Sequence, residues 1–196
     1  MHLKSALIVC AVFFLSSAWG EGLTLEQIET FVTFYKAHFR ENINTFSLEE
    51  GEELFQQLGI NTMRDSLKAK FIDKKPAREL LMASILVAVQ DTKFEENESR
   101  MRFDRAEVEQ SLHVFGTMDP GGTGLITPDE YADYVKALKT LVAVQEIHHP
   151  ERAEKTRQAK EVLNKFDGVT SLNLAEFIHI AMCLTDHLVL KPTPGQ

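Results

Sequence analysis

Hydrophobic residues recur along most of the chain with the spacing of an α-helix. In the segment after Thr24, apolar side chains return every three or four residues, which places them on one helical face. They are Ile28, Phe31, Val32, Tyr35 and Phe39. A later segment has the same pattern, with Tyr131, Tyr134, Val135, Leu138, Leu141 and Val142. No segment shows the sustained alternation of a strand, so the pattern predicts an all-α fold.

Helix-start signals support this prediction. Capping boxes pair a Ser, Thr, Asp or Asn with a Glu or Gln three residues later. Such boxes begin at Thr24, Ser47, Asp104, Thr127 and Asn173. Pro76 and Pro150 suit the first turn of two further helices, and Gly59 suits the end of the helix that follows Ser47. We therefore expect helices to start at each of the five boxes and at the two prolines.

The first twenty residues differ from the rest of the chain. Lys4 supplies a positive charge, residues 5–15 are almost wholly apolar, and Ala18 and Gly20 are small residues at the positions that a signal peptidase recognises. This composition predicts a secretory signal peptide at residues 1–20. The mature protein would then start at Glu21 and be secreted to the extracellular space.

The charge balance excludes some classes of partner. The chain has 21 Lys and Arg against 29 Asp and Glu, a net charge of −8, which becomes −9 when the leader takes Lys4 away. An acidic chain without a basic stripe is unsuited to nucleic acid or to anionic lipid. The longest apolar run after the leader, residues 80–89, is about half of a membrane span. We expect neither a nucleic-acid partner nor a membrane span.

Cysteine content argues against a disulfide-stapled scaffold. Cys10 belongs to the predicted leader, so Cys183 is the only cysteine of the mature chain. In a secreted protein, a single cysteine is open to an intermolecular bond. A dimer linked through Cys183 is therefore one expectation.

A polar, charged stretch divides the chain into two regions. Residues 92–102 lack a helical apolar stripe, and Asn97 begins a glycosylation sequon in them. We expect an N-terminal helical lobe at 21–100, a C-terminal pair of helical hairpins at 101–190 and a flexible tail at 191–196.

One segment between two expected helices carries a chemical signature. It has twelve residues, with Asp119 first, Gly124 sixth, Ile126 eighth and Glu130 twelfth, and aromatic residues flank it on both sides. This segment resembles the calcium-binding loop of the EF-hand superfamily. The resemblance is firm over residues 107–188 and implies an EF-hand-like pair of helix-loop-helix units there.

The resemblance also implies a set of calcium ligands. These are Asp119, Thr123, the Leu125 carbonyl, Thr127 through a water, and Glu130. The third position, where the family has an oxygen-bearing side chain, is Gly121. Only two carboxylates would face the ion, so we expect a dissociation constant on the order of 0.1 to 1 mM or weaker. Such a site would be partly filled outside cells.

Glu130 has a second interpretation. Thr127 and Glu130 form a capping box, in which the glutamate bonds the Thr127 amide and needs no metal. The same box recurs at Ser47 and Asn173, where no twelve-residue calcium loop precedes it.

A shorter loop follows in the C-terminal region. From Asp167 to Glu176 there are ten residues, and the oxygen-bearing middle of a calcium loop is missing. We expect this loop to be a metal-free partner whose Leu172 pairs with Ile126 in a short two-stranded contact. Residues 46–50 give a fainter echo of the same pattern in the N-terminal region.

Other chemistry has little support in the sequence. There is no Gly-x-Ser-x-Gly elbow, phosphate loop or dinucleotide fingerprint, so we expect no enzyme activity. His179, Cys183 and His187 follow one another at i, i+4 spacing and neighbouring pairs would suit a transition metal. Their position beside an apolar stripe favours the edge of the core instead.

The sequence thus leads to two hypotheses for function. In the first, the protein is a secreted, low-affinity calcium-binding protein, with Ca²⁺ stabilising or opening the C-terminal lobe. In the second, it is a calcium-independent interaction module or hydrophobic-ligand carrier built on degenerate EF-hands, with a protein helix or an apolar small molecule as partner.

Overall fold

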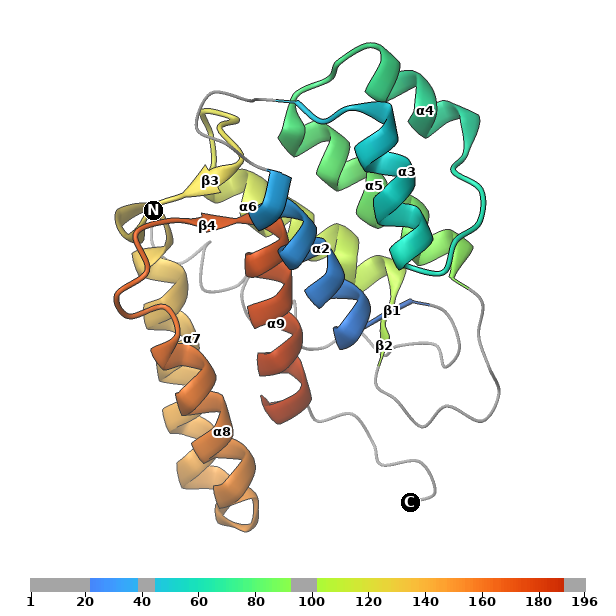
Figure 1. Ribbon diagram of the computed structural model, residues 1–196. Coiled ribbons are helices and arrows are strands. Elements are labelled where there is room, and N and C mark those ends of the chain that lie inside the picture. The colour runs from blue at the N-terminus through green and yellow to red at the C-terminus, as the bar shows by residue number, and fades with distance from the viewer. Residues whose placement is uncertain (1–21, 39–44, 93–101, 189–196) are drawn as a thin grey trace.

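The computed structural model describes residues 22–38, 45–92 and 102–188. The predicted leader, Asn97 and the predicted tail at 191–196 lie outside these ranges. Eight α-helices, one 3₁₀ turn and four two-residue strands make up the described residues (Figure 1). The prediction of an all-α fold is confirmed.

The elements before residue 92 are one strand and four helices. They are β1 Leu23–Thr24, α2 Leu25–His38, α3 Leu48–Gln57, α4 Asp65–Ile72 and α5 Ala77–Asp91. The elements after residue 101 are three strands, four α-helices and the 3₁₀ turn. They are β2 Arg102–Phe103, α6 Arg105–Met118, β3 Leu125–Ile126, α7 Pro128–His148, η1 Pro150–Arg152, α8 Ala153–Asn164, β4 Leu172–Asn173 and α9 Leu174–Leu188.

The capping signals correctly placed the helix starts. At α3, the Glu50 carboxylate accepts the Ser47 amide at 2.7 Å, and the Ser47 hydroxyl accepts the Glu50 amide at 3.1 Å. Reciprocal bonds of this kind also form between Asp104 and Glu107 at the start of α6. Each box satisfies backbone amides that have no partner inside the helix.

Helix α4 was not predicted. Its N-cap is Arg64, which makes no side-chain capping bond, and the helix is only eight residues long. Its inward side chains, Leu67 and Phe71, are both buried. Tertiary packing rather than a local signal therefore determines this helix.

The four strands form two antiparallel pairs. Strand β3 pairs with β4, and Ile126 is the register partner of Leu172, as predicted. Strand β1 pairs with β2, with Leu23 opposite Phe103. All four of these side chains are buried. Every strand leads straight into a helix, so each pair fixes the starting points of two helices.

Helix α9 is the centre of the packing. It lies between α2 and α8 and also packs on α6 and α5 (Figure 1). One continuous hydrophobic core includes Phe31 of α2, Leu80 of α5, Phe115 of α6 and Phe177 of α9. The division into lobes at 21–100 and 101–190 stays a prediction, because its boundary falls outside the described ranges. The core is shared by residues from both sides of that boundary.

None of the helices in the described ranges is long and apolar enough to cross a membrane.

The strand contact gives a first prediction. Ile126 is fully buried, whereas Ile72 is 66% exposed on α4. Replacing Ile126 with Ala should lower the free energy of unfolding by about 3 kcal/mol, because it removes buried apolar atoms and leaves a cavity. Ile72→Ala should change it by less than about 0.5 kcal/mol. Urea denaturation of both variants measures the difference, and equal effects would contradict the described packing.

Candidate metal site

The loop that resembles a calcium site lies between α6 and α7. Asp119 follows the last residue of α6, and its amide bonds the Phe115 carbonyl at 2.9 Å. Gly122 and Gly124 have φ of +67° and +81°, the left-handed conformation that glycine adopts most easily. These turns fold the loop back on Asp119, whose exposed fraction is only 2%.

The loop's own donors surround the Asp119 carboxylate. Oδ1 accepts the Thr123 amide at 2.8 Å, and Oδ2 accepts the Gly124 amide at 2.8 Å. A buried carboxylate is tolerated only when hydrogen bonds and opposite charge replace its hydration. Two backbone amides supply part of that replacement here.

Arg78 supplies the opposite charge. It extends from the first turn of α5, and its Nη1 lies 3.1 Å from Asp119 Oδ2. The same nitrogen lies 3.4 Å from the Asp119 carbonyl oxygen. The Arg78 side chain is 21% exposed, so this ion pair is largely shielded from water. A guanidinium group therefore neutralises the carboxylate that would be the first ligand of a calcium ion.

Two other predicted ligands bond within the same turn. The Thr123 hydroxyl lies 3.1 Å from Asp119 Oδ1 and 2.9 Å from the Leu125 carbonyl oxygen. It has one proton, so it donates to one of these acceptors at a time. The structure thus brings Asp119, Thr123 and Leu125 together in a network of the loop's own hydrogen bonds.

Thr127 and Glu130 bond to each other. Glu130 Oε2 accepts the Thr127 amide at 2.7 Å and the Thr127 hydroxyl at 2.9 Å. This is the capping-box geometry of the second interpretation, and the Glu130 side chain lies on the exposed side of the loop. In this arrangement, the glutamate is the hydrogen-bond acceptor for the backbone amide at the start of α7.

A basic side chain from the N-terminal region also contacts the second loop, the one between Asp167 and Glu176. Glu176 Oε2 accepts the Asn173 amide at 3.0 Å, and Glu176 Oε1 lies 3.0 Å from Nζ of Lys36 on α2. Asp167, the first residue of this loop, lies on the surface 3.4 Å from Lys139. Neither Lys36 nor Arg78 could be identified from the sequence, because a single basic residue on a helix matches no motif.

The charges of the two loops act on a neighbouring tyrosine. Burial raises the pKa of Tyr35 above its ordinary value, and the negative charges of Glu176 and Asp119 raise it further. Tyr35 lies on α2, one residue before Lys36. Glu176 and Asp119 thus lie close enough to Tyr35 for their charges to act on it.

No group of three or more His, Cys, Asp or Glu side chains within the described ranges is placed to hold a metal ion. On α9, His179 Nε2 lies 3.3 Å from Glu29 Oε1 and 4.0 Å from Cys183 Sγ. Cys183 is half-buried at this position. His179 thus links α9 to α2, which agrees with a place at the edge of the core.

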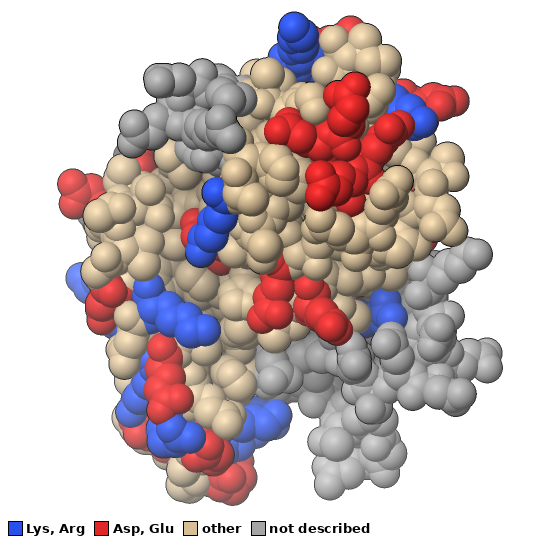
Figure 2. Space-filling view, in the orientation of Figure 1, with Lys and Arg blue, Asp and Glu red and all other residues tan. Residues whose placement is uncertain are grey.

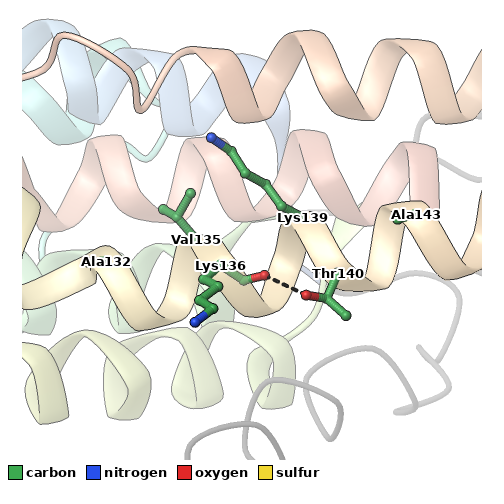
Figure 3. Close-up of a pocket in the computed structure, with 6 residues that line it drawn as sticks. All are labelled: Ala132, Val135, Lys136, Lys139, Thr140 and Ala143. Carbon is green, nitrogen blue, oxygen red and sulfur yellow. Dashed lines mark hydrogen bonds between the residues drawn. The ribbon is translucent and has the colours of Figure 1, made fainter.

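A shallow hollow of about 500 Å³ lies along α7. All the residues that line it come from that helix (Figure 3). They are Ala132, Val135, Lys136, Lys139, Thr140 and Ala143. One turn further on, Val144 and Ile147 are 46% and 74% exposed. This face therefore combines apolar side chains with two lysines, and it is open to solvent.

Charge is unevenly distributed over the surface. Figure 2 shows acidic side chains gathered over α3, the helix that contains Glu49, Glu50, Glu52 and Glu53. Basic and acidic groups are interspersed near α8, where Arg157 pairs with Glu154 and Glu161. The lysines of the α7 hollow thus belong to a protein whose net charge is negative.

No protein-family model, curated protein or solved structure matches this chain. The resemblance to EF-hand proteins therefore rests on the residues of the Asp119–Glu130 loop.

The buried ion pair gives a second prediction. Asp119→Asn removes the charge that faces Arg78 and places an amide among hydrogen-bond donors. It should lower the free energy of unfolding by about 3 kcal/mol, because Arg78 keeps a partly buried charge without a counter-ion. Asp167→Asn, at a carboxylate that is 66% exposed, should change it by less than about 0.5 kcal/mol. Chemical denaturation at neutral pH tests both, and a stable Asp119→Asn variant would refute the structural role of the pair.

Proposed function

We propose that this protein is a secreted, calcium-independent interaction module built on degenerate EF-hand-like loops. One observation carries the proposal: the guanidinium of Arg78 lies 3.1 Å from the Asp119 carboxylate, where a bound calcium ion would need its first ligand. A divalent ion there would meet a fixed positive charge. It would also meet a carboxylate that already accepts amide bonds from Thr123 and Gly124.

The remaining ligands support the same proposal. Glu130 bonds its own helix start, and Gly121 offers no oxygen side chain. A calcium site of useful affinity needs several carboxylates in a rigid arrangement. In this loop, the carboxylates of Asp119 and Glu130 already have protein partners.

Low-affinity calcium binding is the second candidate. It is favoured by the turn at Gly124 and by the presence of Asp119, Thr123, Leu125, Thr127 and Glu130 in one twelve-residue loop. Calcium would then be the cofactor and would have to displace Arg78.

Calcium titration separates the two candidates. With a dissociation constant near 0.5 mM, about 5 mM calcium would stabilise the protein by about 1.4 kcal/mol and raise Tm by roughly 3 °C. Under our proposal, Tm in calcium equals Tm in EDTA at the same ionic strength, within about 1 °C.

Glu130→Gln is the matched control for that titration, because glutamine keeps a capping oxygen but loses the carboxylate. A rise in Tm that this variant abolishes would establish the calcium candidate in place of our proposal. A rise that persists in the variant would place the ion outside the loop, and it would equally refute calcium independence.

Secretion is part of the proposal and rests on the leader. Strand β1 begins at Leu23, so cleavage after Gly20 would remove none of the described elements. A dimer through Cys183 also stays a prediction. The proposed role is binding, and none of the proposed residues has a catalytic task.

The outer face of α7 is the proposed contact surface. Ala143, Val144 and Ile147 are exposed on this helix, and Lys136 and Lys139 lie one or two turns before them. Charge complementarity favours a partner helix that has an apolar stripe flanked by acidic residues. An apolar small molecule is less well matched, because one helix alone lines the hollow and would leave most of such a ligand in water.

A synthetic amphipathic peptide tests this surface. A labelled helix of about 18 residues, with glutamates beside its apolar stripe, should bind, and a version with lysines in place of the glutamates should bind at least about tenfold more weakly. Ile147→Asp should weaken binding of the acidic peptide about tenfold, because it places a like charge in the apolar contact. Ile72→Asp, at an exposed position on α4, should not. Fluorescence anisotropy measures each affinity, and equal binding of both peptides would exclude this partner class.

A further inference from the structure

We propose that Arg78 is an internal cation that competes with divalent cations for the Asp119 carboxylate. Docking of α5 on the loop and binding of a metal ion in the loop are then mutually exclusive. This inference rests on the proposed calcium-independent function and names the residue that causes it. Metal binding in this loop would thereby be regulated by the position of a helix from the other half of the chain.

The packing of the loop fits an arginine side chain. A Cβ atom at Gly122 would lie 3.3 Å from Arg78 Nη1, and one at Gly124 would lie 3.2 Å from Arg78 Cβ. Gly116, in the last turn of α6, would place a Cβ 3.4 Å from Arg78 Nη2. Glycines from α6 and from the loop therefore lie against both ends of the Arg78 side chain. Larger residues at Gly122 or Gly124 would press on it.

The charges make simultaneous occupancy unfavourable. Asp119 is buried, and its Oδ2 already accepts both the Gly124 amide and Arg78. A divalent ion on this oxygen would bring two further positive charges next to the guanidinium, in a place with little water to screen them. The ion can bind only when Arg78 leaves.

This competition couples the two halves of the chain. Arg78 belongs to α5, which packs on α6 and α9, whereas Asp119 belongs to the loop between α6 and α7. Because coupling between two binding events is reciprocal, whatever releases α5 increases the affinity of the loop for a cation, and a cation in the loop weakens the docking of α5. An ordinary calcium loop, in contrast, is only stabilised by its ion.

Gly121 offers a different explanation for a loop that does not bind calcium. It leaves the third ligand position without a side-chain oxygen. A side chain is tolerated there: φ is not in the left-handed region, and the nearest atom to an added Cβ is Thr123 Cγ2 at 3.6 Å. The variants Arg78→Gln and Gly121→Asp, singly and combined, therefore distinguish excess positive charge from a missing ligand.

The experiment is a calcium titration of these three variants and the unchanged chain by isothermal calorimetry. Arg78→Gln should increase calcium affinity at least about tenfold, both alone and together with Gly121→Asp, because it removes the competing charge. Adding Glu130→Gln should cancel the gain, which locates the ion in the loop. Arg64→Gln, which breaks the surface ion pair with Asp91, is the matched control and should leave the affinity of the unchanged chain as it is.

The outcomes are distinct. If Gly121→Asp increases the affinity and Arg78→Gln does not do so in either background, the missing ligand is the cause and the competition proposal is wrong. If Arg78→Gln loses helicity without calcium, recovery of the circular dichroism signal on adding calcium supports the proposal, and failure of both Arg78→Gln variants to recover refutes it. A rise of Tm in calcium for the unchanged chain would refute the proposed function instead. The competition proposal would still be decided by comparing the variants with one another, because that comparison does not require the unchanged chain to bind no calcium.

Discussion

The ion pair between Arg78 and Asp119 sets the constraint around which the loop is built. A carboxylate that is 98% covered loses its hydration, and this loss must be replaced by hydrogen bonds and by a counter-charge. The Thr123 and Gly124 amides provide the bonds, and α5 provides the charge. The conformation of the loop and the docking of α5 therefore depend on each other. Lys36 and Glu176 repeat the arrangement at the second loop in a more exposed setting.

A simple local unit recurs through the rest of the fold. The residue before each of the five capping boxes is apolar and buried: Leu23, Phe46, Phe103, Ile126 and Leu172. The box starts a helix, and the buried residue fixes the direction from which the chain enters it. Four of these residues also lie in the two short strand pairs. Burial and hydrogen bonding are thus satisfied together at the same positions.

This unit explains which parts of the structure could be predicted. Helices that begin with a box were located correctly, and so was the contact of Ile126 with Leu172, because both depend on short sequence patterns. Helix α4 has no cap signal, and the pairing of Leu23 with Phe103 joins residues far apart in the chain. Neither has a local cause. In the loop, the spacing of Asp119 and Glu130 indicated candidate ligands, but the partner of Asp119 is a single arginine 41 residues earlier, which only the tertiary structure brings near.

The position of α9 determines when the core can form during synthesis of the chain. The first described helix, α2, packs on the last, and Glu29 meets His179 across 150 residues of sequence. The main packing partner of the apolar face of α2 is α9, which is synthesised after all the other described helices. Contacts of such long range slow folding and leave apolar surface uncovered in the meantime. Assembly of the core is thus complete only after α9 has been synthesised.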